Sequence, residues 1–266
     1  THRWICSWAL AVGVIGMRAL SPTPAWLAMA GRARNVRGLG TGPCGMTMHD
    51  PAPLTPFARR ALLALALLVA GSLAVEYLLL LRATWTELGP VLGSVRYVSY
   101  FTILSNLAVL LVCVSALTGW PAFFARPAVR GAVTLYIALT GVIYALLLRD
   151  TWELEGILRL TDASLHYVVP AVSVLAWLAS PGHGTLRWRL VVSWLAFPVV
   201  YLAWVLLRGA RSGEYPYPFL DVAELGLSVV LFNALVLLGV FLASGGMLVA
   251  VDKVAARRLA SARAPT

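Results

Sequence analysis

The sequence predicts an all-α, polytopic integral membrane protein built as a bundle of six transmembrane helices. Of its 266 residues, 60% are hydrophobic and only 12% are charged, whereas a soluble domain of this length needs a more highly charged surface. The apolar residues also form long runs and not the short alternating stretches of a membrane β-barrel. Both observations favour helices that cross a bilayer.

Six apolar runs are long enough to span, because a helix needs roughly 20 apolar residues to cross the hydrocarbon core. They cover residues 59–81, 98–118, 130–148, 164–180, 189–207 and 222–243. Asp162 precedes the fourth run, which is short, and the turn Pro181-Gly182 follows it. We therefore assign residues 48–250 to the transmembrane domain and residues 251–266 to a basic cytoplasmic tail.

Charged residues alternate between the two ends of these runs and so predict the topology. One side carries ten basic residues, namely Arg59, Arg60, Arg126, Arg130, Arg187, Arg189, Lys253, Arg257, Arg258 and Arg263. The other side carries Asp150, Glu153, Glu155, Asp162, Glu214 and Asp221. The positive-inside rule then places both termini in the cytoplasm. It also accounts for the net charge of +10 without a nucleic-acid partner.

The first 47 residues form a separate N-terminal extension, which we expect to be poorly ordered. The apolar run from Trp4 to Leu20 is barely long enough to span, and a basic, glycine-rich stretch follows it. The sequence begins with Thr, while Met46 and Met48 stand just before the first long run. We interpret residues 1–45 as sequence translated from a misplaced gene start. A signal peptide is the alternative, although no small-residue cleavage site closely follows the apolar run.

Neither a metal nor another cofactor is predicted. Cys6, Cys44 and Cys113 are few and scattered, and no CxxC motif occurs. The four histidines show no spacing typical of metal ligands.

Several polar side chains converge at one predicted depth in the outer leaflet. Four of them lie about one turn inside the outer face on four different runs: Glu76, Thr102, His166 and Glu224. Tyr144 approaches the same level from the third run, residues 130–148. Each has an ordinary explanation, since an intramembrane Thr bonds back to its own helix and a Glu near a helix end snorkels to the interface. His166 is harder to explain in this way, because ionisable groups inside a bilayer are costly and mark functional sites. Their convergence favours a single site.

Spacing suggests the role of each residue. Thr102, Ser105 and Asn106 are three and four residues apart, so they line one helix face. A hydroxyl beside an imidazole is a nucleophile with its base, which gives Thr102 and His166 those roles. One of the two glutamates would fix the imidazole tautomer, and Asn106 would donate a hydrogen bond to an oxyanion.

Three motifs carry a resemblance to a known family. "YFTILSNL" (100–107), "LHYVVPAVSVLAWL" (165–178) and "YPYPFLDV" (215–222) resemble the signatures of the bacterial Pr6Pr family of six-helix membrane proteins. That family is similar to the eukaryotic androgen-induced-gene and androgen-dependent TFPI-regulating proteins, and the resemblance covers residues 50 to about 250. It implies a membrane threonine hydrolase that cleaves fatty acid esters of hydroxy fatty acids. Thr102 and His166 match the family's Thr and His.

Two classes of function follow, together with a third possibility. As a lipid-ester hydrolase of the bacterial inner membrane, the protein would use Thr102 to attack an acyl carbonyl that arrives laterally from the outer leaflet, with membrane lipids or a lipid-like small molecule as its partner. As a non-enzymatic transporter or a lipid or signal sensor, it would use Glu76, His166 and Glu224 as a proton relay. The third possibility is a structural partner of another membrane protein, for which "GSLAVEY" (71–77) offers a small-residue packing face.

Overall fold

A computed structural model describes residues 54–151 and 154–263 of the chain. In these two stretches all regular secondary structure is helical. The predicted extension, residues 1–47, lies outside the described residues. The elements follow in the order α2 (Pro56–Thr84), α3 (Gly89–Tyr97), α4 (Phe101–Thr118), η2 (Ala122–Ala125), α5 (Pro127–Ile143), η3 (Tyr144–Leu148), α6 (Gly156–Ala163), η4 (Ser164–Val168), α7 (Val169–Leu178), α8 (Arg189–Trp194), α9 (Ala196–Ser212), η5 (Pro218–Leu220), α10 (Val222–Leu225) and α11 (Leu227–Arg263).

Five helices in the described residues are long and apolar enough to cross a membrane, in keeping with a multi-pass membrane protein. They are Pro56–Thr84, Phe101–Thr118, Pro127–Leu148, Arg189–Ser212 and Leu227–Arg258. The predicted fourth span is not among them, so the expected number of six is not confirmed by length and composition. That region is helical from 156 to 178, but it consists of the three short elements α6, η4 and α7 and carries Asp162 and His166.

A π-helical turn interrupts this stretch for a reason that can be read in the sequence. Pro170 has no N–H to offer the carbonyl of His166 four residues earlier, and its ring crowds that carbonyl in a regular α-helix. The wider turn η4 precedes Pro170 and contains His166. Such turns occur mostly as single insertions within α-helices, frequently at functional sites.

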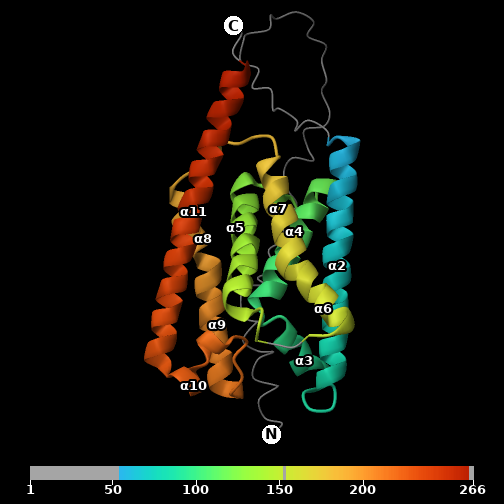
Figure 1. Cartoon of the computed structure of the whole chain (residues 1–266), viewed down its shortest axis with the longest axis vertical. Coiled ribbons are helices and arrows are strands. Elements are labelled where there is room, and N and C mark those ends of the chain that lie inside the picture. Colours follow the sequence, from blue (N-terminus) through green and yellow to red (C-terminus); the bar gives the residue numbers. More distant parts are fainter. Residues whose placement is uncertain (1–53, 152–153, 264–266) are drawn as a thin grey trace, which may run out of the picture. The chain divides into compact units, whose positions relative to one another are not determined.

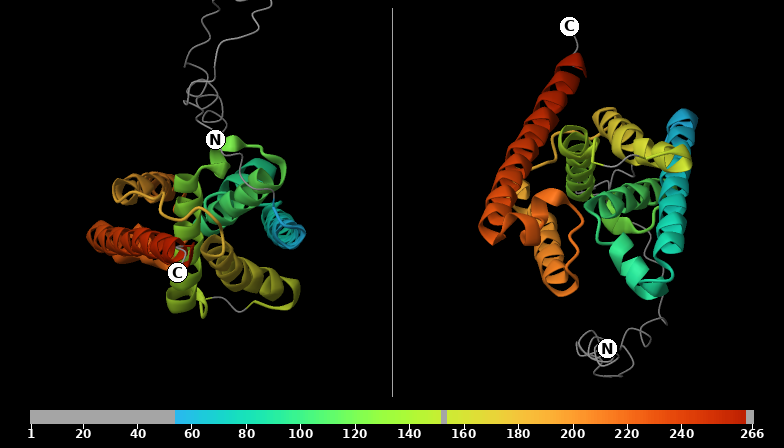
Figure 2. Two further views of the ribbon diagram at one scale, coloured as in Figure 1. Left: turned by 90° about the horizontal axis from the view of Figure 1, so that it is seen from above. Right: turned by 60° about the horizontal axis from the view of Figure 1, so that its bottom comes forward.

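α5 occupies a central position among the helices. It contacts α4, α7 and α11, while α4 also packs against α2. In Figure 2, α5 lies between the α9 and α11 pair and the group formed by α2, α4 and α7. The beginning of α2 and the end of α11 lie at the same end of this bundle (Figure 1).

Two short helices, α3 and α10, lie next to longer ones. α3 packs against α2, and the Tyr97 hydroxyl donates to the Leu73 carbonyl at 2.6 Å. At the predicted start of the sixth span, Gly226 has φ +75° and separates α10 from α11. α11 begins at Leu227 and continues to Arg263, so the last turns of this helix include most of the predicted tail.

Candidate active site

Thr102 and His166 lie in direct contact, although 64 residues separate them in the chain. Thr102 Oγ1 is 3.1 Å from His166 Nε2. Thr102 is the second residue of α4, whereas His166 is the third of η4. The Thr102 residue is buried, and the His166 side chain is only 12% exposed. A hydroxyl and an imidazole are therefore held together away from bulk water.

The other ring nitrogen of His166 faces two acceptors, both from Asp162. Nδ1 is 2.9 Å from Asp162 Oδ1 and 3.0 Å from the Asp162 carbonyl oxygen. Because a carboxylate and a carbonyl only accept hydrogen bonds, Nδ1 carries the proton and Nε2 presents its lone pair. The Thr102 hydroxyl then donates to Nε2. Carboxylate, imidazole and hydroxyl form one chain, which is the arrangement that activates a hydroxyl nucleophile.

Tyr144 contacts both His166 and Asp162 from the end of α5. Its ring stacks on the His166 ring with centroids 3.8 Å apart and 16° between the planes. Its hydroxyl donates to Asp162 Oδ2 at 2.5 Å. Tyr144 is the first residue of η3, so two π-helical turns place the two stacked rings. Tyr144 thus fixes the plane of the imidazole and one oxygen of its carboxylate partner.

The two glutamates proposed to orient His166 do not contact it. Glu76 Oε1 instead accepts a hydrogen bond from the hydroxyl of Thr161, the neighbour of Asp162. Glu224 is exposed in α10, because Gly226 ends that helix before the apolar part of the sixth span begins. Asp162 is the carboxylate that holds the imidazole. Its spacing of four residues from His166 places both on one helix face, which is the signal that identifies it in the sequence.

Asn106 and Ser105 anchor α4 and do not face an open space. The Asn106 amide nitrogen donates to the Thr102 carbonyl at 2.9 Å and to the Leu165 carbonyl of η4 at 3.3 Å. In this arrangement the Asn106 N–H groups are engaged by two backbone carbonyls, and its predicted role as an oxyanion donor stays a prediction. Ser105 Oγ donates to the Thr102 carbonyl at 3.1 Å and lies 3.0 Å from Thr140 Oγ1. Both side chains fix the first turn of α4.

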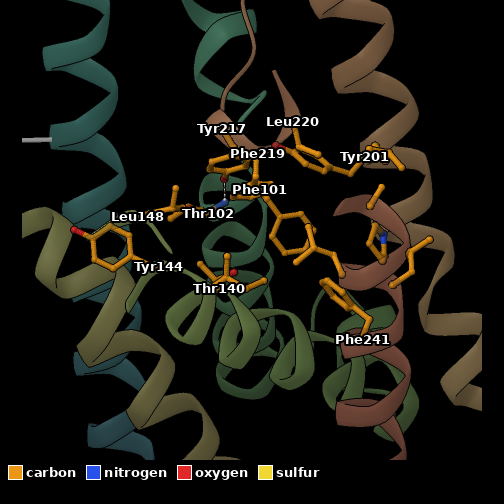
Figure 3. A pocket seen from close by; sticks show the side chains of 16 residues that line it. Phe101, Thr102, Thr140, Tyr144, Leu148, Tyr201, Tyr217, Phe219, Leu220 and Phe241 are labelled. Atoms are coloured by element: carbon orange, nitrogen blue, oxygen red, sulfur yellow. Dashed lines mark hydrogen bonds between the residues drawn. The ribbon is translucent and has the colours of Figure 1, made fainter. Parts of the chain in front are cut away.

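An apolar cavity opens beside Thr102 (Figure 3). It holds about 670 Å³ of empty space, part of it open to the surroundings. Its walls come from α4, α5, η3, α9, α11 and the segment around η5. Thr102 and Tyr144 line it, whereas His166 contacts these two residues from behind the wall. An elongated apolar group in this cavity would have Thr102 at its side.

Tyr217 is a cavity residue that depth and spacing in the sequence do not select. Its hydroxyl oxygen accepts a hydrogen bond from the Thr102 backbone N–H at 3.4 Å (Figure 3). Burial raises the pKa of the Tyr217 phenol above its ordinary value. The residue belongs to the motif "YPYPFLDV", which was the only sequence signal that pointed to it.

Residues 123–249 match the family model described as FAR-17a/AIG1-like protein. This part of the chain is FAR-17a/AIG1-like. The resemblance to the androgen-induced-gene proteins is thereby confirmed. The matched stretch contains Tyr144, Asp162, His166 and Tyr217, while Thr102 precedes it. No curated protein and no solved structure gives a significant match. Within the described residues, no three His, Cys, Asp or Glu side chains cluster closely enough to hold a metal ion.

Proposed function

We propose that this AIG1-like membrane protein is a hydrolase of fatty acyl esters that uses Thr102 as its nucleophile. The observation that carries the proposal is the 3.1 Å contact between Thr102 Oγ1 and His166 Nε2 at the wall of an apolar cavity. His166 is in turn fixed by Asp162. A transporter or sensor does not require a hydroxyl at the end of such a chain.

The reaction follows from this geometry. His166 Nε2 takes the Thr102 proton as Oγ1 attacks the ester carbonyl, and a tetrahedral intermediate forms. His166 then gives that proton to the departing alcohol oxygen, which leaves an acyl-threonine. Water, activated by the same imidazole, hydrolyses the acyl-threonine and restores the hydroxyl. Asp162 stabilises the imidazolium at each step and keeps the ring in the required tautomer.

The lining of the cavity supports an acyl ester as the substrate class. Its lining is almost entirely aromatic and aliphatic, so it fits an acyl chain and disfavours a charged group. The substrate would reach the cavity laterally from the outer leaflet of a bacterial inner membrane. This orientation rests on the positive-inside rule, which places the beginning of α2 and the end of α11 in the cytoplasm.

Fluorophosphonate labelling of membranes tests the proposal. The wild-type protein should form a covalent adduct, and mass spectrometry should locate it on Thr102. Thr102→Ala should abolish labelling, while His166→Ala should slow it by about 10²–10⁴-fold, the usual contribution of a general base. The same membranes should hydrolyse long-chain nitrophenyl esters faster than acetyl esters, because only the long chain fills the cavity.

Thr134→Ala is the matched control. Thr134 is also a buried Thr, and its hydroxyl donates to the Arg130 carbonyl at 2.9 Å, away from the cavity lining. This variant should label like the wild type. Labelling that persists in Thr102→Ala would remove Thr102 as the nucleophile, and a wild-type protein that neither labels nor hydrolyses esters would overturn the proposal.

A further inference from the structure

Three tyrosines line the cavity, and their hydroxyl groups differ in what they contact. The Tyr144 hydroxyl donates to Asp162, and the Tyr201 hydroxyl donates to the Ser99 carbonyl at 2.9 Å. The Tyr217 hydroxyl oxygen, in contrast, accepts the Thr102 N–H, and this hydroxyl donates to no acceptor in the described residues. Among these three, it is the hydroxyl whose proton is available to a molecule in the cavity.

The position of this hydroxyl matters because of where charge would develop. Attack by Thr102 on an acyl carbonyl produces an oxyanion beside Thr102, and hydrogen-bond donors already in place there lower the barrier. Asn106 is not free to donate, as its amide is bound to two backbone carbonyls. Tyr217 contacts the backbone of the nucleophile itself and is 7% exposed, so its hydroxyl is fixed in a site with little water.

We propose that Tyr217 is a further catalytic residue, whose hydroxyl donates a hydrogen bond to the oxyanion formed when Thr102 attacks an acyl ester; this inference rests on the proposed function. As the Oγ1–carbon bond forms, the carbonyl electron pair moves onto the carbonyl oxygen, which accepts the Tyr217 hydrogen bond. Tyr217 keeps its proton throughout. The electron pair returns when the alcohol leaves with the proton carried by His166.

The surroundings of Tyr217 suit this role. The N–H it accepts belongs to the first turn of α4, where backbone donors lack partners within the helix. A hydroxyl that accepts one hydrogen bond becomes a stronger donor in another. Burial also raises the pKa of the phenol, so the group remains a neutral donor across the working pH range.

The first test compares Tyr217→Phe with the wild type in purified protein. The variant keeps the ring and loses only the hydroxyl, so kcat for a long-chain ester should fall by about 10²–10³-fold while KM changes little. Tyr136→Phe is the matched control, because Tyr136 is equally buried but lies outside the cavity lining and donates to the Trp194 carbonyl at 2.7 Å. It should retain the wild-type kcat.

A second measurement separates catalysis from packing. A long-chain trifluoromethyl ketone forms an oxyanion on Thr102, whereas an ether of the same length cannot. Tyr217→Phe should weaken ketone binding by the factor by which kcat/KM falls and leave ether binding unchanged. Equal losses for both ligands would show that Tyr217 only shapes the cavity, which would overturn the inference.

If Tyr217→Phe does not fold, a smaller change at the same position still tests the inference. 3-Fluorotyrosine at position 217 is nearly the same size and a stronger donor, so it should raise the ketone-to-ether affinity ratio; an unchanged ratio would overturn the inference. The two proposals fail separately. An inactive wild type contradicts the hydrolase, whereas a wild type that depends on Thr102, with Tyr217→Phe at full kcat, contradicts only the role of Tyr217.

Discussion

Replacement of Gly141 by alanine should push α5 away from the helix that carries His166. Gly141 lies in α5 three residues before Tyr144, where α5 passes the junction of η4 and α7. A Cβ atom at this position would lie 2.9 Å from the His166 carbonyl oxygen and 3.0 Å from Pro170 Cβ. Neither neighbour can swing aside, because one is backbone and the other is a proline ring.

The size of the effect follows from these distances. Comfortable contacts between non-bonded heavy atoms begin at about 3.5 Å, so the helices must separate by roughly half an ångström or distort locally. Overpacking of this kind costs about 1–3 kcal/mol, whereas alanine in place of a helical glycine contributes about 0.5–1 kcal/mol of stability. We therefore expect a net loss of about 0–2.5 kcal/mol in the free energy of unfolding.

The same displacement should slow the proposed reaction. It acts on His166, which lies 3.1 Å from Thr102, and on Tyr144, which stacks on the imidazole. Misplacement of reacting groups by up to 1 Å costs as much as about 10²-fold in rate, so fluorophosphonate labelling should slow by roughly 10–100-fold.

Thermal unfolding in detergent, together with the labelling rate, measures both effects. Gly71→Ala is the control, because a Cβ atom there meets nothing within 4 Å. It should melt at or above the wild-type temperature and label normally. A Gly141→Ala protein that is as stable as Gly71→Ala, with an unchanged labelling rate, would refute the inference that close contact at Gly141 positions His166.

Three further substitutions test hydrogen bonds of buried carboxylates. Asp162→Asn keeps the side-chain shape but removes the carboxylate from His166 Nδ1; ester hydrolysis should fall by about 10³–10⁴-fold in kcat, and a variant with wild-type kcat would remove Asp162 from the chain. Tyr144→Phe should keep the ring stack and lose only the hydrogen bond to Asp162, so kcat should drop by a smaller factor of about 3–10; a loss as large as that of Asp162→Asn would contradict this ranking. At the other end of the bundle, Asp252 is 2% exposed, 3.2 Å from His183 Nδ1, and accepts the Leu186 N–H, so Asp252→Asn should destabilise the fold by about 3–5 kcal/mol. Thermal unfolding measures the loss of stability in Asp252→Asn. The control is Asp150→Asn, which should melt like the wild type because the Asp150 side chain is exposed.

The contacts of a site residue could be predicted from the sequence where the residue lies at a known depth in a continuous helix. Thr102 and His166 stand near the outer ends of their predicted spans, and equal depth was enough to bring them together. The same argument also predicts that Glu224 lies beside them. It does not, because Gly226 breaks the helix and leaves Glu224 in a separate turn. Depth predicts position only where the helix is unbroken.

Spacing places Asp162 on the same helix face as His166, but depth in the membrane favours Glu76 or Glu224 as the carboxylate that orients the imidazole. Asp162 precedes the fourth apolar run, so it served to mark the end of a span. In the structure the helix begins earlier, at Gly156, and carries Asp162 one turn before His166. Charged residues next to a span stay helical when they find partners, as Asp162 does with Tyr144.

Contacts set by loops or by irregular turns could not be predicted from periodicity. Tyr217 reaches Thr102 from a loop 115 residues later in the chain. Pro170 gives a reason for the turn at His166, but no comparable signal precedes the π-helical turn that begins at Tyr144. These features depend on tertiary packing, to which residues distant in the chain contribute.

The setting of the site also explains how a threonine could serve as a nucleophile. Its hydroxyl is weak and its β-branched side chain is rotationally restricted, so it needs a base held in one orientation. Asp162, Tyr144 and the turn around His166 fix that base, and each uses polar atoms that would otherwise be unpaired in an apolar interior. The groups that would activate Thr102 are therefore also groups that join α4, η3 and η4. Substitutions of Asp162, His166 or Tyr144 should therefore alter stability and reactivity together. The Tyr217 hydroxyl accepts only a long hydrogen bond in the resting state, so its loss should alter reactivity far more than stability.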